Sequence, residues 1–106
     1  MMNLRDTVDL MNSNDYKDRF IAEYWQTKIR YEKLKDFNTR IEAASETVFT
    51  KCKVEEPDHD CPDGVLRRQQ NHMGEYLHLL ELRAVIEKID LNAPMKCCEG
   101  KECEKV

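Results

Sequence analysis

Histidine and glutamate are the side chains of this sequence whose spacing comes closest to a metal or acid–base site. Glu75 and His78 have the Glu-x-x-His spacing with which some helix bundles hold iron. Such a site needs a second pair from a facing helix, and residues 14–44, the other long helix predicted below, contain no histidine. His72 and His78 differ by six positions, which puts them on different faces of a helix. We therefore predict packed or surface histidines and a solvated carboxylate face.

A catalytic nucleophile would need a serine or cysteine held beside a base. His59 and Cys61 are close in the sequence, but no nucleophile motif surrounds them. There is also no glycine-rich phosphate loop and no recognisable metal triad. The sequence predicts a protein that is not an enzyme.

Cysteine is the second metal-ligating residue type. The candidate ligands form two groups: Cys52, His59 and Cys61 in a central loop, and Cys97, Cys98 and Cys103 near the C-terminus. Zinc would accept four of them in tetrahedral geometry. Adjacent cysteines depart from the usual Cys-x2-Cys spacing, however, so incidental thiols are the favoured interpretation. Structural zinc and redox pairing stay open as alternatives, and we expect no cofactor.

Cationic and aromatic side chains could instead bind a small anionic ligand. Arginine holds phosphate through two parallel hydrogen bonds, and tyrosine rings stack on bases. The candidates for such a site are Arg67, Arg68, His72 and Tyr76 on one predicted helix and Tyr24 and Lys28 on the other. In a symmetric oligomer, copies of these residues could converge on one ligand. Ordinary surface charge is the alternative interpretation.

Composition limits the class of protein. The 106 residues suffice for one domain, and 36% charged residues with only three glycines and three prolines favour helices. A formal charge of −4 argues against a partner such as duplex nucleic acid. No apolar run approaches the roughly 18 residues of a membrane span, and the N-terminus lacks the apolar core of a signal peptide. We expect a cytoplasmic protein with no membrane partner.

Two long helices must position these side chains. The first is predicted over residues 14–44, with Asn14 as its N-cap, and the second over residues 62–91, with Pro62 at its first position. Residues 1–13 form an N-terminal arm, 45–61 a loop, and 92–106 a flexible tail that contains cysteines. The apolar seam of the first helix is predicted at Phe20, Tyr24, Thr27, Tyr31, Leu34, Asn38 and Ile41. That of the second is predicted at Leu66, Met73, Leu77, Leu80 and Ala84.

Both helices carry more apolar residues than one partner helix can cover. The surplus is Ile21, Trp25 and Ile29 on the first helix and Leu79, Leu82 and Ile86 on the second. Exposed together, these six side chains would form a patch of a size that usually marks an interface. The fold class predicted from the pattern is therefore all-α: two long antiparallel helices, a helical hairpin with a short N-terminal arm, that pack as a homo-oligomeric bundle.

Two segments resemble a known family. The first is Asp15-Tyr-Lys-Asp-Arg-Phe-Ile-Ala-Glu-Tyr24, continuing to Tyr31-Glu-Lys-Leu34. The second begins at Cys61-Pro and continues through Gln70, Met73-Gly-Glu-Tyr-Leu77 and Leu80-Glu to Ile86-Glu87. They resemble a family of small helical-hairpin proteins from bacteriophages and prophages of Firmicutes, described as related to a crAss-like phage protein. The resemblance covers about two thirds of the chain and leaves out the arm and the tail.

The resemblance implies a phage origin, a helical hairpin and the host bacterial cytoplasm as location. Small oligomeric helical phage proteins include sponges, which sequester nucleotide signals of bacterial immune systems. By analogy of size, origin and architecture, we expect a counter-defence protein that sequesters such a signal. The alternative is an adaptor or inhibitor that binds a host protein through its apolar or acidic helix faces.

Overall fold

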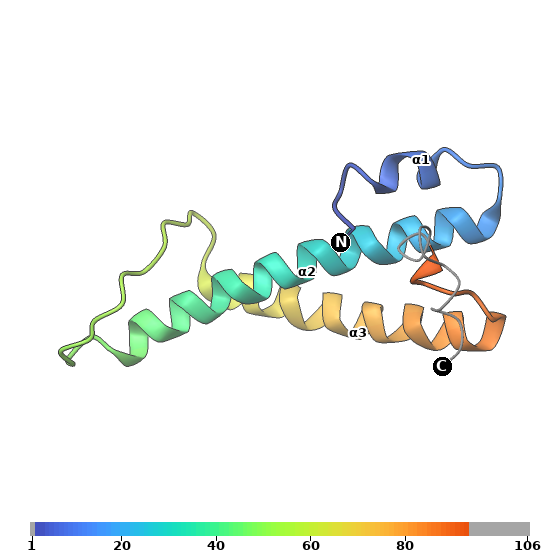
Figure 1. Cartoon of the computed structure of the whole chain (residues 1–106). Coiled ribbons are helices and arrows are strands. Elements are labelled where there is room, and N and C mark those ends of the chain that lie inside the picture. The colour runs from blue at the N-terminus through green and yellow to red at the C-terminus, as the bar shows by residue number, and fades with distance from the viewer. Residues whose placement is uncertain (1, 94–106) are drawn as a thin grey trace, which may run out of the picture.

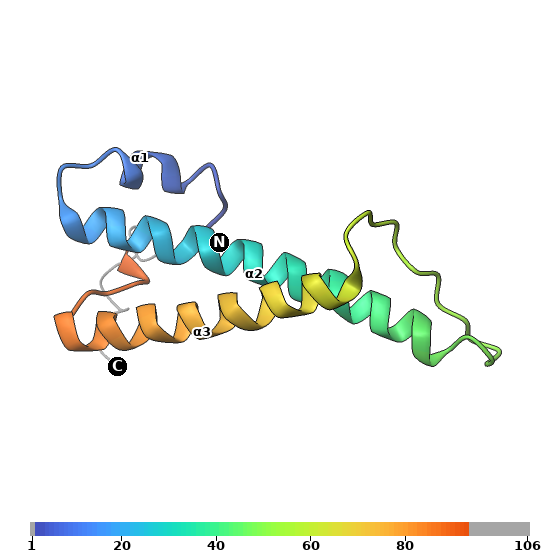
Figure 2. The same cartoon turned by 180° about the vertical axis from the view of Figure 1, so that it is seen from behind.

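The computed structural model describes residues 2–93. Within this range the elements are three helices: α1 (Thr7–Met11), α2 (Tyr16–Glu46) and α3 (Asp63–Glu87). α2 lies between α1 and α3, and the view from behind shows the same order (Figures 1 and 2). The chain is elongated, with extents of 53 × 27 × 25 Å. The predicted all-α class is confirmed for the described part of the chain.

Local chemistry accounts for both helix starts. α2 begins after Asp15, whose carboxylate accepts a hydrogen bond of 3.0 Å from the backbone N–H of Lys17. The N-cap is therefore Asp15, one residue later than the predicted Asn14. α3 begins at Asp63, and Pro62 is its N-cap in extended conformation rather than its first helical residue. No Gly or Pro interrupts the 31 residues of α2, which agrees with its length.

α3 runs back along α2. The hydroxyl of Tyr16, at the start of α2, donates a hydrogen bond to Glu87 at the end of α3. The amide of Asn38, later in α2, donates a hydrogen bond of 3.2 Å to the carbonyl of Leu66 near the start of α3. The core lies along this seam, with Phe20, Tyr24, Leu77, Leu80 and Ala84 all buried. The heptad positions predicted from the sequence therefore supply the core.

Asn38 is the buried polar residue of this seam. Its amide also donates 2.9 Å to Oε1 of Gln70, while its own Oδ1 has no partner among the described residues. A polar group in an apolar seam favours one register of the helices, since any shift would leave the amide without its acceptors. Asn38 therefore holds Gln70 in place at the α2–α3 contact.

The apolar surplus predicted for α2 is covered within the chain. Ile21 and Trp25 are buried, and Ile29 is half-buried against the same core. α3 ends at Glu87, earlier than the predicted residue 91, because Lys88 adopts the left-handed conformation and turns the chain back. Residues 89–91 then lie on α2, where the Trp25 indole donates 2.7 Å to the carbonyl of residue 91. The expectation that these three α2 residues are exposed is wrong for this reason.

The N-terminal arm contains α1, which packs on the face of α2 away from α3 (Figure 1). Thr7 is fully buried; its hydroxyl donates to the carbonyl of Leu4 and accepts 2.9 Å from the Gln26 amide. Met2 joins the main core. The arm is thus an ordered part of the fold.

The loop between α2 and α3 is held by His59. Its Nε2 lies 2.8 Å from the Glu56 carboxylate and its Nδ1 lies 2.6 Å from the carbonyl of Cys61. Both partners only accept hydrogen bonds, so this geometry suits an imidazolium that donates from both nitrogens. The hydrogen bond to Glu56, followed by that to the Cys61 carbonyl, raises the pKa of His59. Its ring meets Phe37 of α2 edge-on, with ring centroids 6.0 Å apart.

Among residues 2–93, no helix is both long and apolar enough to cross a membrane.

Candidate functional site

A groove of about 820 Å³ lies where α2 crosses the middle of α3. Its lining comes from one residue of α2, Tyr31, and from six residues of α3: Gln70, Asn71, Gly74, Glu75, His78 and Leu79. Gly74 explains the close approach of the helices, because a Cβ at this position would lie 3.3 Å from Cε1 of Tyr31. The absent side chain leaves room for the tyrosine ring beside the α3 backbone.

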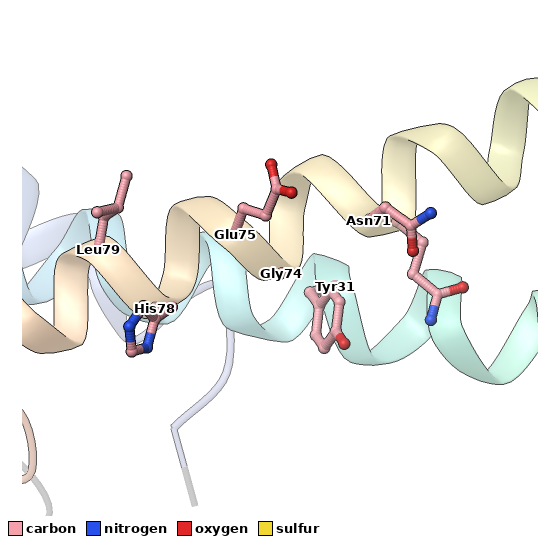
Figure 3. Close-up of a pocket in the computed structure, with 7 residues that line it drawn as sticks. Tyr31, Asn71, Gly74, Glu75, His78 and Leu79 are labelled. Carbon is pink, nitrogen blue, oxygen red and sulfur yellow. The ribbon is translucent and has the colours of Figure 1, made fainter.

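The side chains of the groove diverge from α3. In Figure 3, Tyr31 and His78 project to one side of the α3 ribbon, whereas Glu75 and Leu79 project to the other. Asn71 lies one turn before Glu75, toward the start of α3. The groove is open, and the α3 residues Asn71, Glu75, His78 and Leu79 are all exposed at its rim.

Three polar groups of the groove have no protein partner within the described residues. These are the Tyr31 hydroxyl, the Asn71 amide and the His78 imidazole. Gln70 is held by Asn38, which leaves the NH2 group of Gln70 able to donate. The Glu75 carboxylate lies 3.6 Å from Nδ1 of His72, and both side chains are exposed. The groove therefore combines an aromatic ring with amide and imidazole groups that can form hydrogen bonds to a ligand.

Cations flank the groove along each helix. Lys28 and Lys35 lie three residues before and four residues after Tyr31, so they share its side of α2. Lys28 pairs with Glu32 at 3.5 Å, whereas Lys35 has no ionic partner in the described structure. Arg67, four residues before Asn71, pairs with Asp63 at 3.3 Å. Lys35 is thus the cation beside Tyr31 that is free to meet an anion.

A second hollow, of about 420 Å³, lies where α1 meets α2 and includes Arg19 and Arg30. Arg19 already donates 2.8 Å to the carbonyl of Ser13. No aromatic side chain lines this hollow. The groove at Tyr31 is the larger site and the better match to a ligand with an aromatic ring.

The six sequence-predicted binding residues do not converge in one chain. Lys28 and Arg67 flank the groove on α2 and α3, and Arg68 is exposed with no partner among residues 2–93. His72 pairs with Glu75 at the rim. The two predicted tyrosines instead tie the helices together: Tyr24 donates 2.9 Å to Glu81, and Tyr76 donates to Glu23.

Burial, followed by the hydrogen bond to Glu81, raises the pKa of Tyr24. Because the pKa of Tyr24 is higher in the folded than in the unfolded state, ionisation of Tyr24 opposes folding. The stability that neutral Tyr24 contributes is therefore complete below about pH 10 and is lost as the pH rises further. We expect the difference in melting temperature between the wild type and Tyr24→Phe to be constant up to about pH 9 and to shrink above about pH 10. Thermal melts over this range test the prediction. A difference that stays constant across the range would contradict it.

The predicted metal candidates receive no support from the described residues. Cys52 and Cys61 are free thiols, and no group of three potential ligands comes together within residues 2–93. Cys97, Cys98 and Cys103 lie outside the described residues. Their proposed roles remain predictions.

The six binding residues predicted from the sequence do not include Tyr31, Gln70, Asn71 or Gly74. The sequence predicts Tyr31 as a residue of the seam, and its ring does lie against Gly74 of α3. Because glycine has no side chain to cover the ring, Tyr31 also lines the groove at the surface. The available signal was Gly74, the only glycine in the interior of either predicted long helix. A glycine there weakens the helix and usually indicates a close approach.

Comparison with curated proteins and with solved structures finds no match. One family model does match, that of Sequestin, over residues 14–86. This range contains α2, the connecting loop, nearly all of α3 and the whole groove at Tyr31, and it leaves out α1. It also agrees with the extent of the resemblance seen in the sequence. Since the match spans more than half of the chain, the protein belongs to the Sequestin family.

Proposed function

We propose that this protein sequesters a small nucleotide-type signal of a bacterial immune system, as a phage counter-defence protein in the host cytoplasm. Membership of a family whose name denotes sequestration supports a binding role. The observation that carries the proposal is the groove at Tyr31, where a ring, two amides and an imidazole lie together beside an unpaired lysine. We propose binding without turnover, since sequestration needs only affinity.

Each part of the groove suits one part of a nucleotide. The Tyr31 ring offers a surface on which a base can stack. The amides of Gln70 and Asn71 can pair with the polar edge of a base, where a bidentate contact discriminates one base from another. Lys35 lies one helical turn from Tyr31 and can meet a phosphate.

The direct test is depletion of nucleotides from solution by the purified full chain. AMP, ADP-ribose and two cyclic dinucleotides serve as probes, and the free probe is measured after the protein is filtered away. Retention of at least one probe, with release of the intact compound on denaturation, is expected. Failure to retain any of them, or release of a changed compound, would count against the proposal.

A charge reversal locates the binding site. Lys35→Glu is expected to weaken retention of the bound probe by about tenfold or more, since it replaces an attractive charge beside the groove with a repulsive one. Lys33→Glu is the matched control: it makes the same change two residues away, where the side chain faces elsewhere on α2. Calorimetric titration of both variants gives the comparison. Equal loss in the two would indicate general electrostatics rather than a site at the groove.

One observation favours a second candidate, a partner protein of the host. Leu79, Leu82, Val85 and Ile86 are exposed along α3, and apolar surface of this kind binds proteins as well as ligands. In this case a stoichiometric host protein would co-purify with the chain, and a charge introduced by Leu82→Glu would release it. We rank this below sequestration because the groove and the family both favour a small ligand.

A further inference from the structure

Gln70 is the residue of the groove whose hydrogen-bonding direction is fixed by the rest of the protein. It lines the groove at Tyr31, and its Oε1 accepts a hydrogen bond of 2.9 Å from Nδ2 of Asn38. The same Nδ2 donates 3.2 Å to the backbone carbonyl of Leu66. Both hydrogens of the Asn38 amide are therefore engaged, one by each acceptor.

The backbone sets the direction of this network. A carbonyl oxygen can only accept, so the end of the Asn38 amide that faces Leu66 must be its NH2 group. If the amide were turned over, its Oδ1 would face the Leu66 carbonyl with no hydrogen between the two oxygens. The observed orientation instead leaves Oδ1 of Asn38 buried without a partner among the described residues. The Leu66 carbonyl therefore decides which way Asn38 points.

Gln70 consequently offers its NH2 group to the groove. Asn38 holds Oε1 in the seam, so the opposite end of the planar amide is the part left for a ligand. Nε2 of Gln70 has no partner within residues 2–93 and does not belong to the buried polar atoms, so it is open to solvent. The groove thus contains a hydrogen-bond donor of fixed direction.

The other polar groups of the groove have no such constraint. The Tyr31 hydroxyl, the Asn71 amide and the His78 imidazole have no protein partner in the described part of the chain. A hydroxyl can donate or accept, an amide can turn over, and an imidazole can change tautomer. These groups adapt to a donor or to an acceptor on the ligand. Discrimination between the two therefore falls to Gln70.

A base edge made of acceptors matches a fixed donor. Guanine presents two acceptors side by side, N7 and O6, whereas adenine presents the acceptor N7 beside an amino group that donates. A glutamine that binds adenine uses both ends of its amide, and here Asn38 holds the accepting end. An amino group placed against Nε2 of Gln70 would bring two donors together. A ring carbonyl in the same place would form a hydrogen bond.

We infer that Gln70, oriented by Asn38, makes the groove selective for a base with a ring carbonyl, such as guanine, over a base with an amino group in its place, such as adenine. Gln70 is the group that contacts the ligand, and Asn38 is a positioning residue that acts through it. The inference rests on the proposed function for the presence of a nucleotide. It adds the chemical class of the base.

The direction of the network can be measured without any ligand. In NMR spectra of the full chain labelled with nitrogen-15, the side-chain NH2 of Asn38 is expected to exchange with solvent about 100-fold or more slowly than that of Gln70. The reason is that both hydrogens of Asn38 are bonded in the seam, whereas those of Gln70 are open. Spectra of Asn38→Asp and Gln70→Glu identify the two signals. A protected Gln70 NH2, or fast exchange at both residues, would overturn the inference.

Nucleotides that differ only in the base test the preference itself. GMP and IMP carry an oxygen where AMP carries an amino group, and cyclic di-GMP with cyclic di-AMP forms a second comparison. By calorimetric titration, the wild type is expected to bind the compounds with the oxygen about tenfold or more tightly. Equal affinities, or a preference for the adenine compounds, would refute the inference and leave sequestration standing. Binding of none of these compounds would refute the base preference, and the depletion test given above would then decide the proposed function separately.

Two substitutions should remove the preference by different routes. In Asn38→Asp, the new carboxyl group accepts from Gln70, so Gln70 turns its NH2 group to the seam and its Oε1 to the groove. Gln70→Glu keeps an acceptor for Asn38 and leaves its second carboxylate oxygen for the groove. In both variants the ratio of affinities for IMP and AMP is expected to fall from about tenfold to about one or below. A loss of stability alone would weaken both nucleotides alike and would not change this ratio.

Gln69→Glu is the matched control, because it makes the same change from amide to carboxylate at an exposed position outside the groove. It should keep the ratio of the wild type. Thermal melts accompany each titration, since Asn38→Asp places a carboxyl group in the buried seam. If that variant does not fold, Gln70→Glu decides the question at a half-buried position. A wild-type ratio in Gln70→Glu would overturn the inference.

Discussion

Phe20→Ala is expected to lower the free energy of unfolding by about 3–5 kcal/mol, the largest effect on stability that we predict. Phe20 is only 4% exposed and lies in the core between α2 and α3. Its ring meets that of Tyr16 edge-on and carries the Arg83 guanidinium 4.9 Å from its centroid. Alanine would leave a cavity and remove both contacts. Since the total free energy of unfolding of a small domain is about 5–15 kcal/mol, the variant is expected to be partly unfolded.

Phe49→Ala provides the matched control, because the same side chain is 99% exposed there, in the loop that follows α2. Its effect should stay within about 0.5 kcal/mol. Urea denaturation followed by circular dichroism measures both variants under one set of conditions. Similar losses in the two would mean that Phe20 does not occupy the core described here.

Gly74→Leu is expected to have the largest effect on ligand binding. A Cβ at this position already meets the Tyr31 ring, so the remaining atoms of leucine must displace the ring or enter the groove. Either outcome removes the proposed base-stacking position, and we expect affinity for the retained probe to fall by about 100-fold, or about 2.7 kcal/mol. The helix itself should be preserved, since leucine is favoured over glycine in a helix by up to about 1 kcal/mol.

Gly64→Leu makes the same replacement in the first turn of α3, where an added Cβ meets nothing within 4 Å. It should leave affinity unchanged. Calorimetric titration together with a thermal melt separates binding from folding for both variants. Unchanged affinity in Gly74→Leu, with the groove filled, would show that the ligand binds elsewhere.

The two pairs of replacements test different levels of the protein. Phe20 and Phe49 compare a core position with a solvent position and so test the fold. Gly74 and Gly64 compare a helix crossing with an open helix surface and so test the site. A loss of binding in Gly74→Leu with a normal melting transition would locate the binding function at the crossing.

The periodicity of the sequence was enough to predict the helices and the seam between them. Phe20 and Tyr24 in one helix, and Leu77, Leu80 and Ala84 in the other, recur at intervals of three and four residues. Such spacing puts side chains on one face of any helix, whatever surrounds it. The end of α3 was predicted less well. Ile89 continues the apolar pattern, yet it is buried by a turn back onto α2 and not by the helix itself.

None of the six residues predicted to bind a ligand lines the groove. Lys28 and Arg67 lie beside the groove, but Tyr24 and Tyr76, chosen as aromatic residues that could stack on a base, are engaged with Glu81 and Glu23 across the helix pair. Sequence spacing relates residues on one helix. It does not reveal which carboxylate of another helix a tyrosine will meet, because this depends on how the helices are aligned.

What the sequence determined by itself was therefore local: an all-α chain, its two long helices and the residues that form the seam between them. These properties depend on spacing and on the intrinsic preferences of residues within one helix. Only the tertiary structure decided that residues 89–91 cover Trp25, so that the apolar strip left exposed along the two long helices lies on α3. It likewise decided that Gly74 meets Tyr31, because the register of α2 against α3 is set by the core and by Asn38. A groove made by two helices exists only once both are in place.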